Sequence, residues 1–483
     1  MLEKEELKPL LVFECFAEVN KIPRPSKREE RMIEFLRKFG ENLGLPTKVD
    51  DAGNVAISKP ATPGYEDRPA VILQSHMDMV CEKNADVDFD FDKDAIQTYI
   101  DGEWMKAKGT TLGADDGIGV AMEMAILMSN DIEHGPLQCV FTRDEETGLS
   151  GAEGMKSGFM EGDFLINLDS EDEGEIFVSC AGGATTTAEY PFPTEDVPAD
   201  YYTARVTVRG LSGGHSGDDI NKNRANANKI LIRFLAGEFE KTDLRLVDIQ
   251  SGGLHNAIPR EGFAVIAVPQ AFRDQLSADV NLLQAALREE FSVTEPDLCI
   301  ELESQPSASV AGKREFVQKM LLSLLAVFNG VYAMSQEIEG FVETSTNLAN
   351  VKLTGDVVRI VTSQRSSILS NRENISAIVR AALTLGGAEN IVTGEGYPGW
   401  ATNPNSILVK KTVESYVRLF GKQPIVRGIH AGLECGLFSV KYPHLDMVSF
   451  GPTLRGVHSP DERLLIPTVQ MVWDHLLDLL KTI

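Results

Sequence analysis

Two kinds of apolar pattern alternate along the first part of the chain. Helical spacing of apolar residues predicts helices, over residues 7–19, 29–43 and 119–128. Short continuous apolar runs predict buried strands, at residues 70–73, 137–141 and 164–168. Buried strands that alternate with helices indicate an α/β domain, with a mixed, largely parallel central sheet flanked by helices.

The pattern changes after residue 184. Polar and apolar residues alternate over residues 203–209, as in a strand with one face in water. A helix and two strands are predicted next, at residues 225–239, 244–249 and 263–268. A strand at residues 356–362 and a helix at 373–385 repeat this order, which leaves open two related halves. We therefore expect an inserted α+β domain over residues 185–396.

The last part of the chain is expected to return to the first domain. A strand is predicted at residues 447–450, and a closing helix at residues 468–480. The first domain would then be discontinuous, over residues 1–184 and 397–483.

Composition narrows the class of protein. A chain of 483 residues with 43% hydrophobic residues is long enough for two or three conventional cores. The chain has 46 basic and 72 acidic residues, and its net charge of −26 disfavours nucleic acid and anionic membranes as partners. The first residues do not resemble a signal peptide, so we expect a cytoplasmic protein. Six widely spaced cysteines without a Cys-x-x-Cys pair indicate reduced thiols.

Residues suited to metal binding or proton transfer follow three of the predicted strands. His76 and Asp78 follow the first strand, Glu145 and Glu146 the second, and Asp169 the third. Ligands of open α/β sheets gather at the carboxyl ends of the strands. We therefore expect these side chains to share one site.

Each motif has a structural alternative when it is taken alone. A single His76 would more often be a hydrogen-bonded structural residue, but a carboxylate at Asp78 can fix its tautomer and favour metal binding. The segment 113–117 could be a glycine turn before a helix, although its adjacent carboxylates also suit a bridging ligand. Neighbouring Glu145 and Glu146 can point to different sides, one to a metal and one to a water. With His458, these residues provide the ligands of a two-metal hydrolase and one spare glutamate.

The combination of motifs resembles a known family. His-x-Asp at 76–78, Gly-Ala-Asp-Asp-Gly at 113–117, the Glu pair, Asn-Leu-Asp-Ser at 167–170 and Gly-Val-His-Ser-Pro at 456–460 are similar to those of the di-zinc peptidases that include carnosinase and acetylornithine deacetylase. Residues 102–117, 169–183 and 430–436 more narrowly resemble the bacterial aminoacyl-histidine dipeptidases, also called peptidase D. The likeness covers essentially the whole chain.

The resemblance implies a role for each residue of the site. It implies two Zn²⁺ ions per chain, for which Co²⁺ or Mn²⁺ can substitute. Their ligands would be His76 and Asp169 for one ion, Glu146 and His458 for the other, and Asp115 as the bridge. Asp78 would orient His76, and Glu145 would act as general base and later as general acid. A cis peptide bond after Asp115 is also implied.

The resemblance further implies that residues 185–396 form a lid and dimerisation domain of a homodimer. His215, on a glycine-rich loop, would stabilise the developing oxyanion at a partner subunit's site. Asn256 and Arg365 would hold the carboxylate of the substrate, a task suited to a planar guanidinium. Glu434 would pair with the free amine of the substrate.

The predicted function is a metal-dependent dipeptidase. It would hydrolyse unblocked dipeptides, Xaa-His included, by attack of a zinc-bridging water with Glu145 as general base. One alternative is a di-zinc amidohydrolase that removes an acyl group from an amino acid and has no need of a partner for a free amine. A second alternative, from another class, is a metal-binding or scaffold protein without catalysis, which the spare Glu145 disfavours.

Overall fold

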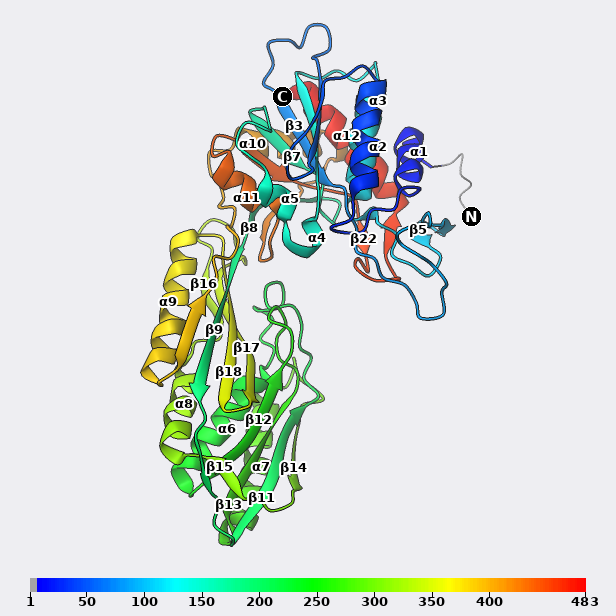
Figure 1. Ribbon diagram of the computed structural model, residues 1–483. Coiled ribbons are helices and arrows are strands. Elements are labelled where there is room, and N and C mark those ends of the chain that lie inside the picture. Colours follow the sequence, from blue (N-terminus) through cyan, green and yellow to red (C-terminus); the bar gives the residue numbers. More distant parts are fainter. Residues whose placement is uncertain (1–6) are drawn as a thin grey trace. The chain divides into compact units, whose positions relative to one another are not determined.

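The computed structural model describes residues 7–483 and divides into two compact units (Figure 1). The first unit contains the chain up to Ser179, with Trp400–Gly428 and Leu433–Ile483. The second contains Cys180–Gly399 and Ile429–Gly432. The second unit extends beyond the expected insertion of residues 185–396, because its strand β9 (Gly182–Pro191) begins before residue 185.

The first unit is built on a mixed eight-stranded sheet with the order β1-β2-β6-β3-β7-β21-β8-β20. The strands are β1 (Thr47–Val49), β2 (Val55–Lys59), β3 (Val71–His76), β6 (Leu137–Thr142), β7 (Phe164–Asn167), β8 (Glu175–Cys180), β20 (Ile425–Ile429) and β21 (Asp446–Ser449). Neighbours among β6, β3, β7 and β21 are parallel, whereas β1 and β2 are antiparallel. Every residue of β3, β6 and β7 is buried, which accounts for their apolar runs.

Helices and a small second sheet complete the first unit. The helices are α1 (Leu10–Val19), α2 (Glu30–Asn42), α3 (Ala114–Met128), α4 (Glu145–Gly148), α5 (Ser150–Gly154), α10 (Ile407–Phe420), α11 (Glu434–Lys441) and α12 (Ile466–Thr482). The small sheet has the order β22-β23-β5-β4, from β22 (Leu454–Arg455), β23 (Arg463–Leu465), β5 (Trp104–Ala107) and β4 (Thr98–Asp101). Helix α3 is buried along nearly its whole length and contacts α1 and β3. The predicted α/β class is confirmed.

The second unit is an antiparallel sheet with helices. Its sheet has the order β14-β11-β13-β12-β17-β18-β9-β19, and β16 pairs with β17. Its strands, besides β9, are β10 (Thr194–Asp196), β11 (Tyr201–Arg209), β12 (Arg245–Gly252), β13 (Gly262–Pro269), β14 (Cys299–Ser304), β15 (Val310–Gly312), β16 (Gly330–Met334), β17 (Val342–Thr354), β18 (Val357–Ser366) and β19 (Glu389–Thr393). Its helices are α6 (Ala227–Lys241), α7 (Arg273–Glu290), α8 (Arg314–Ala326) and α9 (Leu369–Leu385).

One core joins the two stretches of the second unit that have similar patterns. Strand β17 pairs on one side with β12 of the earlier stretch and on the other with β18 of the later one, so both stretches contribute to a single sheet. Buried side chains from both, such as Val206, Leu231 and Ile360, belong to the same apolar cluster. The expected α+β class of this part is therefore observed. Over residues 7–483, no helix combines the length and the apolar character needed to cross a bilayer.

Candidate metal centre

Three neighbouring strands of the first unit end at one edge of the sheet and carry the predicted residues there. His76 is the last residue of β3, and Glu145 and Glu146 follow β6 within α4. Asp169 lies two residues beyond β7. Because β6, β3 and β7 are adjacent and parallel, these side chains meet as the sequence predicts.

The remaining two residues reach this edge from elsewhere in the first unit. Asp115 lies at the start of α3, where the backbone of Asp115 and Asp116 is not yet helical. The peptide bond between them is cis, which confirms the expectation from the family resemblance. His458 lies in the loop that joins β22 to β23.

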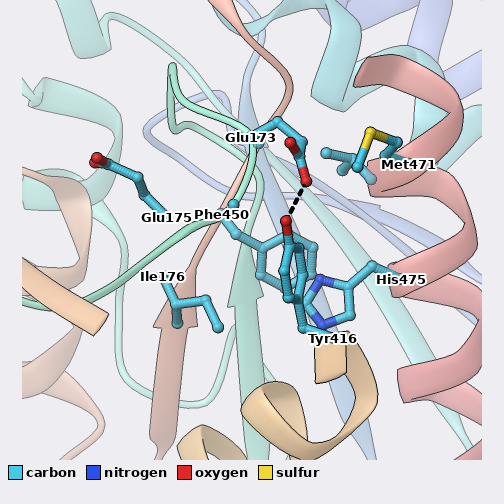
Figure 2. Close-up of a pocket in the computed structure, with 10 residues that line it drawn as sticks. Glu173, Glu175, Ile176, Tyr416, Phe450, Met471 and His475 are labelled. Atoms are coloured by element: carbon cyan, nitrogen blue, oxygen red, sulfur yellow. Dashed lines mark hydrogen bonds between the residues drawn. The ribbon is translucent and has the colours of Figure 1, made fainter. Parts of the chain in front are cut away.

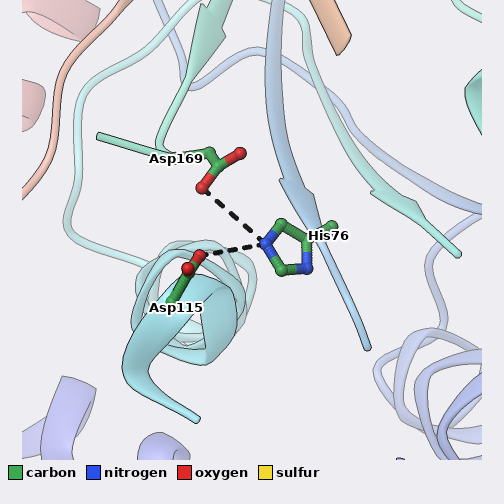
Figure 3. A group of neighbouring side chains, drawn as sticks. All are labelled: His76, Asp115 and Asp169. Atoms are coloured by element: carbon green, nitrogen blue, oxygen red, sulfur yellow. Dashed lines mark hydrogen bonds and ion pairs between the residues drawn. The ribbon is translucent and has the colours of Figure 1, made fainter. Parts of the chain in front are cut away.

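The first group of ligand atoms comes from His76, Asp115 and Asp169 (Figure 3). The Nε2 atom of His76 lies 3.1 Å from Oδ1 of Asp115 and 3.7 Å from Oδ1 of Asp169. One ligand atom from each residue lies within 4.8 Å of the others, so the three can hold one metal ion.

The second group contains Asp115 again, with Glu146 and His458. Nε2 of His458 lies 3.2 Å from Oδ2 of Asp115 and 3.0 Å from Oε2 of Glu146. Asp115 therefore presents one carboxylate oxygen to each group. This is the geometry of a carboxylate that bridges two ions.

Electrostatics at this edge favour cations. Hydrogen bonds from the His458 ring to the carboxylates of Asp115 and Glu146 raise the pKa of His458 to about 11. Burial alone would lower the pKa of His76, but nearby Asp169, Asp115 and Asp78 raise it well above its usual range. Burial would raise the pKa of Asp115, yet its hydrogen bonds with the two histidines lower it. The same carboxylates would also attract a divalent cation.

Asp78 contacts several of these groups through its carboxylate. Its Oδ1 lies 3.3 Å from Nδ1 of His76, the nitrogen that does not face the other carboxylates. It also accepts hydrogen bonds from the backbone N–H groups of Glu145 at 3.0 Å and Glu146 at 3.3 Å. The hydroxyl of Ser26 donates to its other oxygen at 2.7 Å. One buried carboxylate thus contacts three of the predicted residues.

Glu145 belongs to neither ligand group among the described residues. Burial raises the pKa of its carboxyl well above the usual range. A raised pKa suits a group that must accept a proton and then donate it near neutral pH.

Glu434 is fully buried at the start of α11 in the first unit. Its Oε2 accepts hydrogen bonds from Gln74 and from the hydroxyl of Thr142, both at 2.7 Å. Burial raises its pKa to about 7. Oε1 has no hydrogen-bond partner within the part of the chain that the structure describes.

The second unit brings the predicted substrate residue Arg365 next to His215, the predicted oxyanion group. Nη2 of Arg365 lies 3.3 Å from Nε2 of His215, and Nη1 donates to the hydroxyl of Tyr397 at 3.0 Å. The backbone of Asn256 contacts the loop of His215, because its carbonyl accepts from the N–H of Ser216 at 2.8 Å.

Sequence reasoning missed Tyr397 and assigned no role to His430. The Tyr397 ring lies so close to Gly183 and Gly432 that a Cβ on either glycine would come within 2.9 Å of it. These two glycines are therefore the sequence feature that could have indicated a large neighbouring side chain. His430 is buried beside Ser345, and burial lowers its pKa to about 3. Both residues belong to the second unit with Arg365.

A small cavity elsewhere in the first unit is lined by polar groups that already have partners (Figure 2). The hydroxyl of Tyr416 donates to Glu173 at 2.6 Å. Nε2 of His475 lies 2.9 Å from the carbonyl oxygen of Thr412. These contacts are structural, and we assign no substrate to this cavity.

Two ligand groups that share a carboxylate, at the edge of an α/β sheet, define the class of dinuclear metal-dependent hydrolases. Residues 72–482 match the peptidase family M20/M25/M40. The chain belongs to this family of metallopeptidases, and the resemblance inferred from its motifs is confirmed.

Similar proteins cover the whole chain. The cytosol non-specific dipeptidase of Escherichia coli K12 is 44% identical over 483 residues, which are 100% of this chain and 99% of the relative. The crystal structure of the aminoacylhistidine dipeptidase from Vibrio alginolyticus has a TM-score of 0.93 and 42% identity, and covers 100% of this chain and 98% of its own. Aminopeptidase PepT from Bacillus cereus, at 16% identity with 98% of each chain covered, has a TM-score of 0.57 and shares the fold.

Proposed function

We propose that this protein is a cytoplasmic dipeptidase that hydrolyses unblocked dipeptides, Xaa-His included. The observation that carries the proposal is the Asp115 carboxylate, which presents one oxygen to each of two ligand groups while Glu145 belongs to neither. The names of the two relatives that align over their full length, both dipeptidases, support the substrate class.

The donor set of the two groups fits Zn²⁺. Imidazole nitrogens and carboxylate oxygens are ligands that zinc accepts, and Co²⁺ or Mn²⁺ can substitute. Oε1 of Glu146 is buried without a hydrogen-bond partner among the described residues, as expected of an oxygen that serves a metal. We assign His76 and Asp169 to one ion, Glu146 and His458 to the other, and Asp115 to both.

The chemistry follows from these positions. Two bound ions would lower the pKa of a water and polarise the peptide carbonyl. Glu145 then accepts the proton of the attacking water and passes it to the nitrogen of the leaving amine. Asp78 orients His76 and holds the backbone of Glu145, so the base keeps its place beside the ligands.

Substrate selection is proposed to use four polar or charged side chains. Glu434, with one buried oxygen left over, would pair with the free amine of the substrate. Arg365 and Asn256 would hold the substrate carboxylate, and His215 would stabilise the oxyanion. The contact between Arg365 and His215 supports a shared task for these two residues.

A homodimer through the second unit is proposed on its exposed apolar surface. Along the end of α8 and the following strand β16, large apolar side chains are at least one third exposed, at Leu322, Leu325, Phe328, Tyr332 and Met334. Exposed apolar patches commonly mark protein contact sites.

Comparing a free dipeptide with the same dipeptide acetylated at its amine tests the function directly. We expect the zinc-loaded enzyme to hydrolyse the free form and to lose most of its kcat/KM on the acetylated form, because Glu434 then meets no cation. Preference for the acetylated form would identify an N-acyl amino acid deacylase instead. Absence of turnover on both with metal added would favour a non-catalytic protein.

Replacing the shared ligand should affect both ions. In Asp115→Ala, elemental analysis should show reduced occupancy of both sites, because each group loses one of its oxygens. Asp116→Asn is the matched control, since Asp116 is adjacent and buried but belongs to neither group among the described residues. Full occupancy by two ions in Asp115→Ala would remove Asp115 from the bridging role.

A further inference from the structure

The loop that carries His458 also contains a buried acidic residue, Glu462. It joins β22 to β23, whose pairing of Arg455 with Arg463 closes its base. Glu462 is the last residue of this loop and is only 2% exposed. Its backbone N–H donates to the carbonyl of Ser459 at 3.1 Å, so Glu462 is also part of the turn next to His458.

The Glu462 carboxylate accepts hydrogen bonds from four consecutive backbone N–H groups. Oε2 accepts from Leu112 at 2.7 Å and Gly113 at 2.9 Å. Oε1 accepts from Ala114 at 2.8 Å and Asp115 at 3.3 Å. These N–H groups precede the first regular turn of α3, where no helical partner is available to them.

A buried arginine binds a carbonyl group of the same segment. Arg24, 1% exposed, donates from Nη2 to the carbonyl oxygen of Gly113 at 2.6 Å. Gly113 has a positive φ of 67°, and a Cβ there would come within 2.5 Å of Arg24. The backbone before Asp115 is therefore fixed by a carboxylate on its N–H groups and a guanidinium on a carbonyl.

These contacts connect two ligands that are far apart in the sequence. Glu462 shares a loop with His458 and bonds the backbone of Asp115, while Nε2 of His458 lies 3.2 Å from Oδ2 of Asp115. A shift of the Glu462 side chain would move one ligand relative to the other. If the only role of Glu462 were to cap the start of α3, it would not need to lie in the loop that carries His458.

We infer that Glu462 is a positioning residue of the metal centre: its hydrogen bonds to residues 112–115 set the place of Asp115 relative to His458, and hence the affinity of the second ion. The inference rests on the proposed function, in which Asp115 is the bridging ligand.

The test is Glu462→Gln in the full chain, titrated with Zn²⁺ against a chromophoric chelator. The amide NH₂ would face two N–H donors in place of an acceptor, so two of the four hydrogen bonds are lost. We expect the affinity of at least one Zn²⁺ ion to fall about 10–100-fold, the effect usual for groups that orient ligands. With Co²⁺ in place of zinc, the visible spectrum should change in the variant.

Asp446→Asn is the matched control. Asp446 also accepts a backbone N–H, from Leu408 at 3.0 Å, but lies at the first residue of β21 and so at the opposite edge of the sheet. We expect this variant to bind both Zn²⁺ ions as the wild type does. Unchanged zinc affinity in folded Glu462→Gln, or an equal loss in Asp446→Asn, would overturn the inference.

Hydrogen exchange of the wild-type protein provides a second measurement that does not depend on a variant folding. The amides of residues 112–115 should be protected with or without zinc, because their acceptor is Glu462. Rapid exchange of these amides would contradict the inference. A wild-type chain that fails to bind two ions would instead contradict the proposed metal centre, so the two failures are distinguishable.

Discussion

A Glu145→Gln chain is expected to keep its metal ions and to lose about 10²–10⁴-fold in kcat, the usual contribution of general acid-base catalysis. Glutamine has nearly the same shape as glutamate but cannot take the proton from the attacking water. Metal content should persist because Glu145 belongs to neither ligand group among the described residues. Steady-state kinetics with a free dipeptide, paired with elemental analysis, measures both quantities.

Glu153→Gln is a suitable control, since Glu153 is an exposed glutamate in neighbouring α5 and its loss removes the same charge. It should retain wild-type turnover. If Glu145→Gln, folded and loaded with two zinc ions, also turned over normally, then another group must accept the proton and Glu145 is not the base.

The sequence predicted those metal ligands that lie at or shortly after the end of a buried strand. His76 ends a buried strand, Glu146 and Asp169 follow buried strands within four residues, and parallel neighbours place these strand ends at one sheet edge. The apolar pattern therefore predicted the strands, and also that the metal ligands at their ends lie close together. The pairing of Asp115 with His458 could not be predicted this way, because 343 residues separate them and only the family resemblance linked them.

Strand β17 shows why part of the fold escaped prediction. Its sequence contains Thr344, Thr346 and Asn347, polar residues that would ordinarily suggest a solvated segment. All three are buried, and Asn347 donates from its amide to the carbonyl of Ala257 at 2.8 Å. Hydrogen bonds to distant segments make this burial favourable, and no local pattern reports them.

Glu462 illustrates the same limit at the site. Its place in the Gly-Val-His-Ser-Pro-Asp-Glu motif is visible, but an acidic residue at the end of a loop is most often solvated. Its function depends on acceptor geometry toward backbone N–H groups about 350 residues earlier in the chain. Backbone donors carry no sequence signature, so only the structure could reveal this contact.

His215→Ala is expected to lower kcat by about 10²–10³-fold, as the loss of other oxyanion donors does, with zinc content unchanged. The zinc content should persist because the ligands lie in the first unit and His215 in the second. His215 has a fixed environment in which the Asp218 N–H donates to Nδ1 at 3.2 Å and Arg365 lies 3.3 Å from Nε2. His255→Ala, which removes an exposed histidine of the same unit, is the control.

Mixing two inactive chains tests whether His215 acts on a partner subunit. In a heterodimer of His215→Ala and Glu145→Gln, the site with intact Glu145 would receive intact His215 from the other chain. About half of the sites in that species should then be active, by symmetry. Recovered turnover that rises with the fraction of heterodimer, counted by native mass spectrometry, is the expected result. If confirmed heterodimers stay inactive, His215 does not act across the dimer, and its effect on kcat must arise within its own chain.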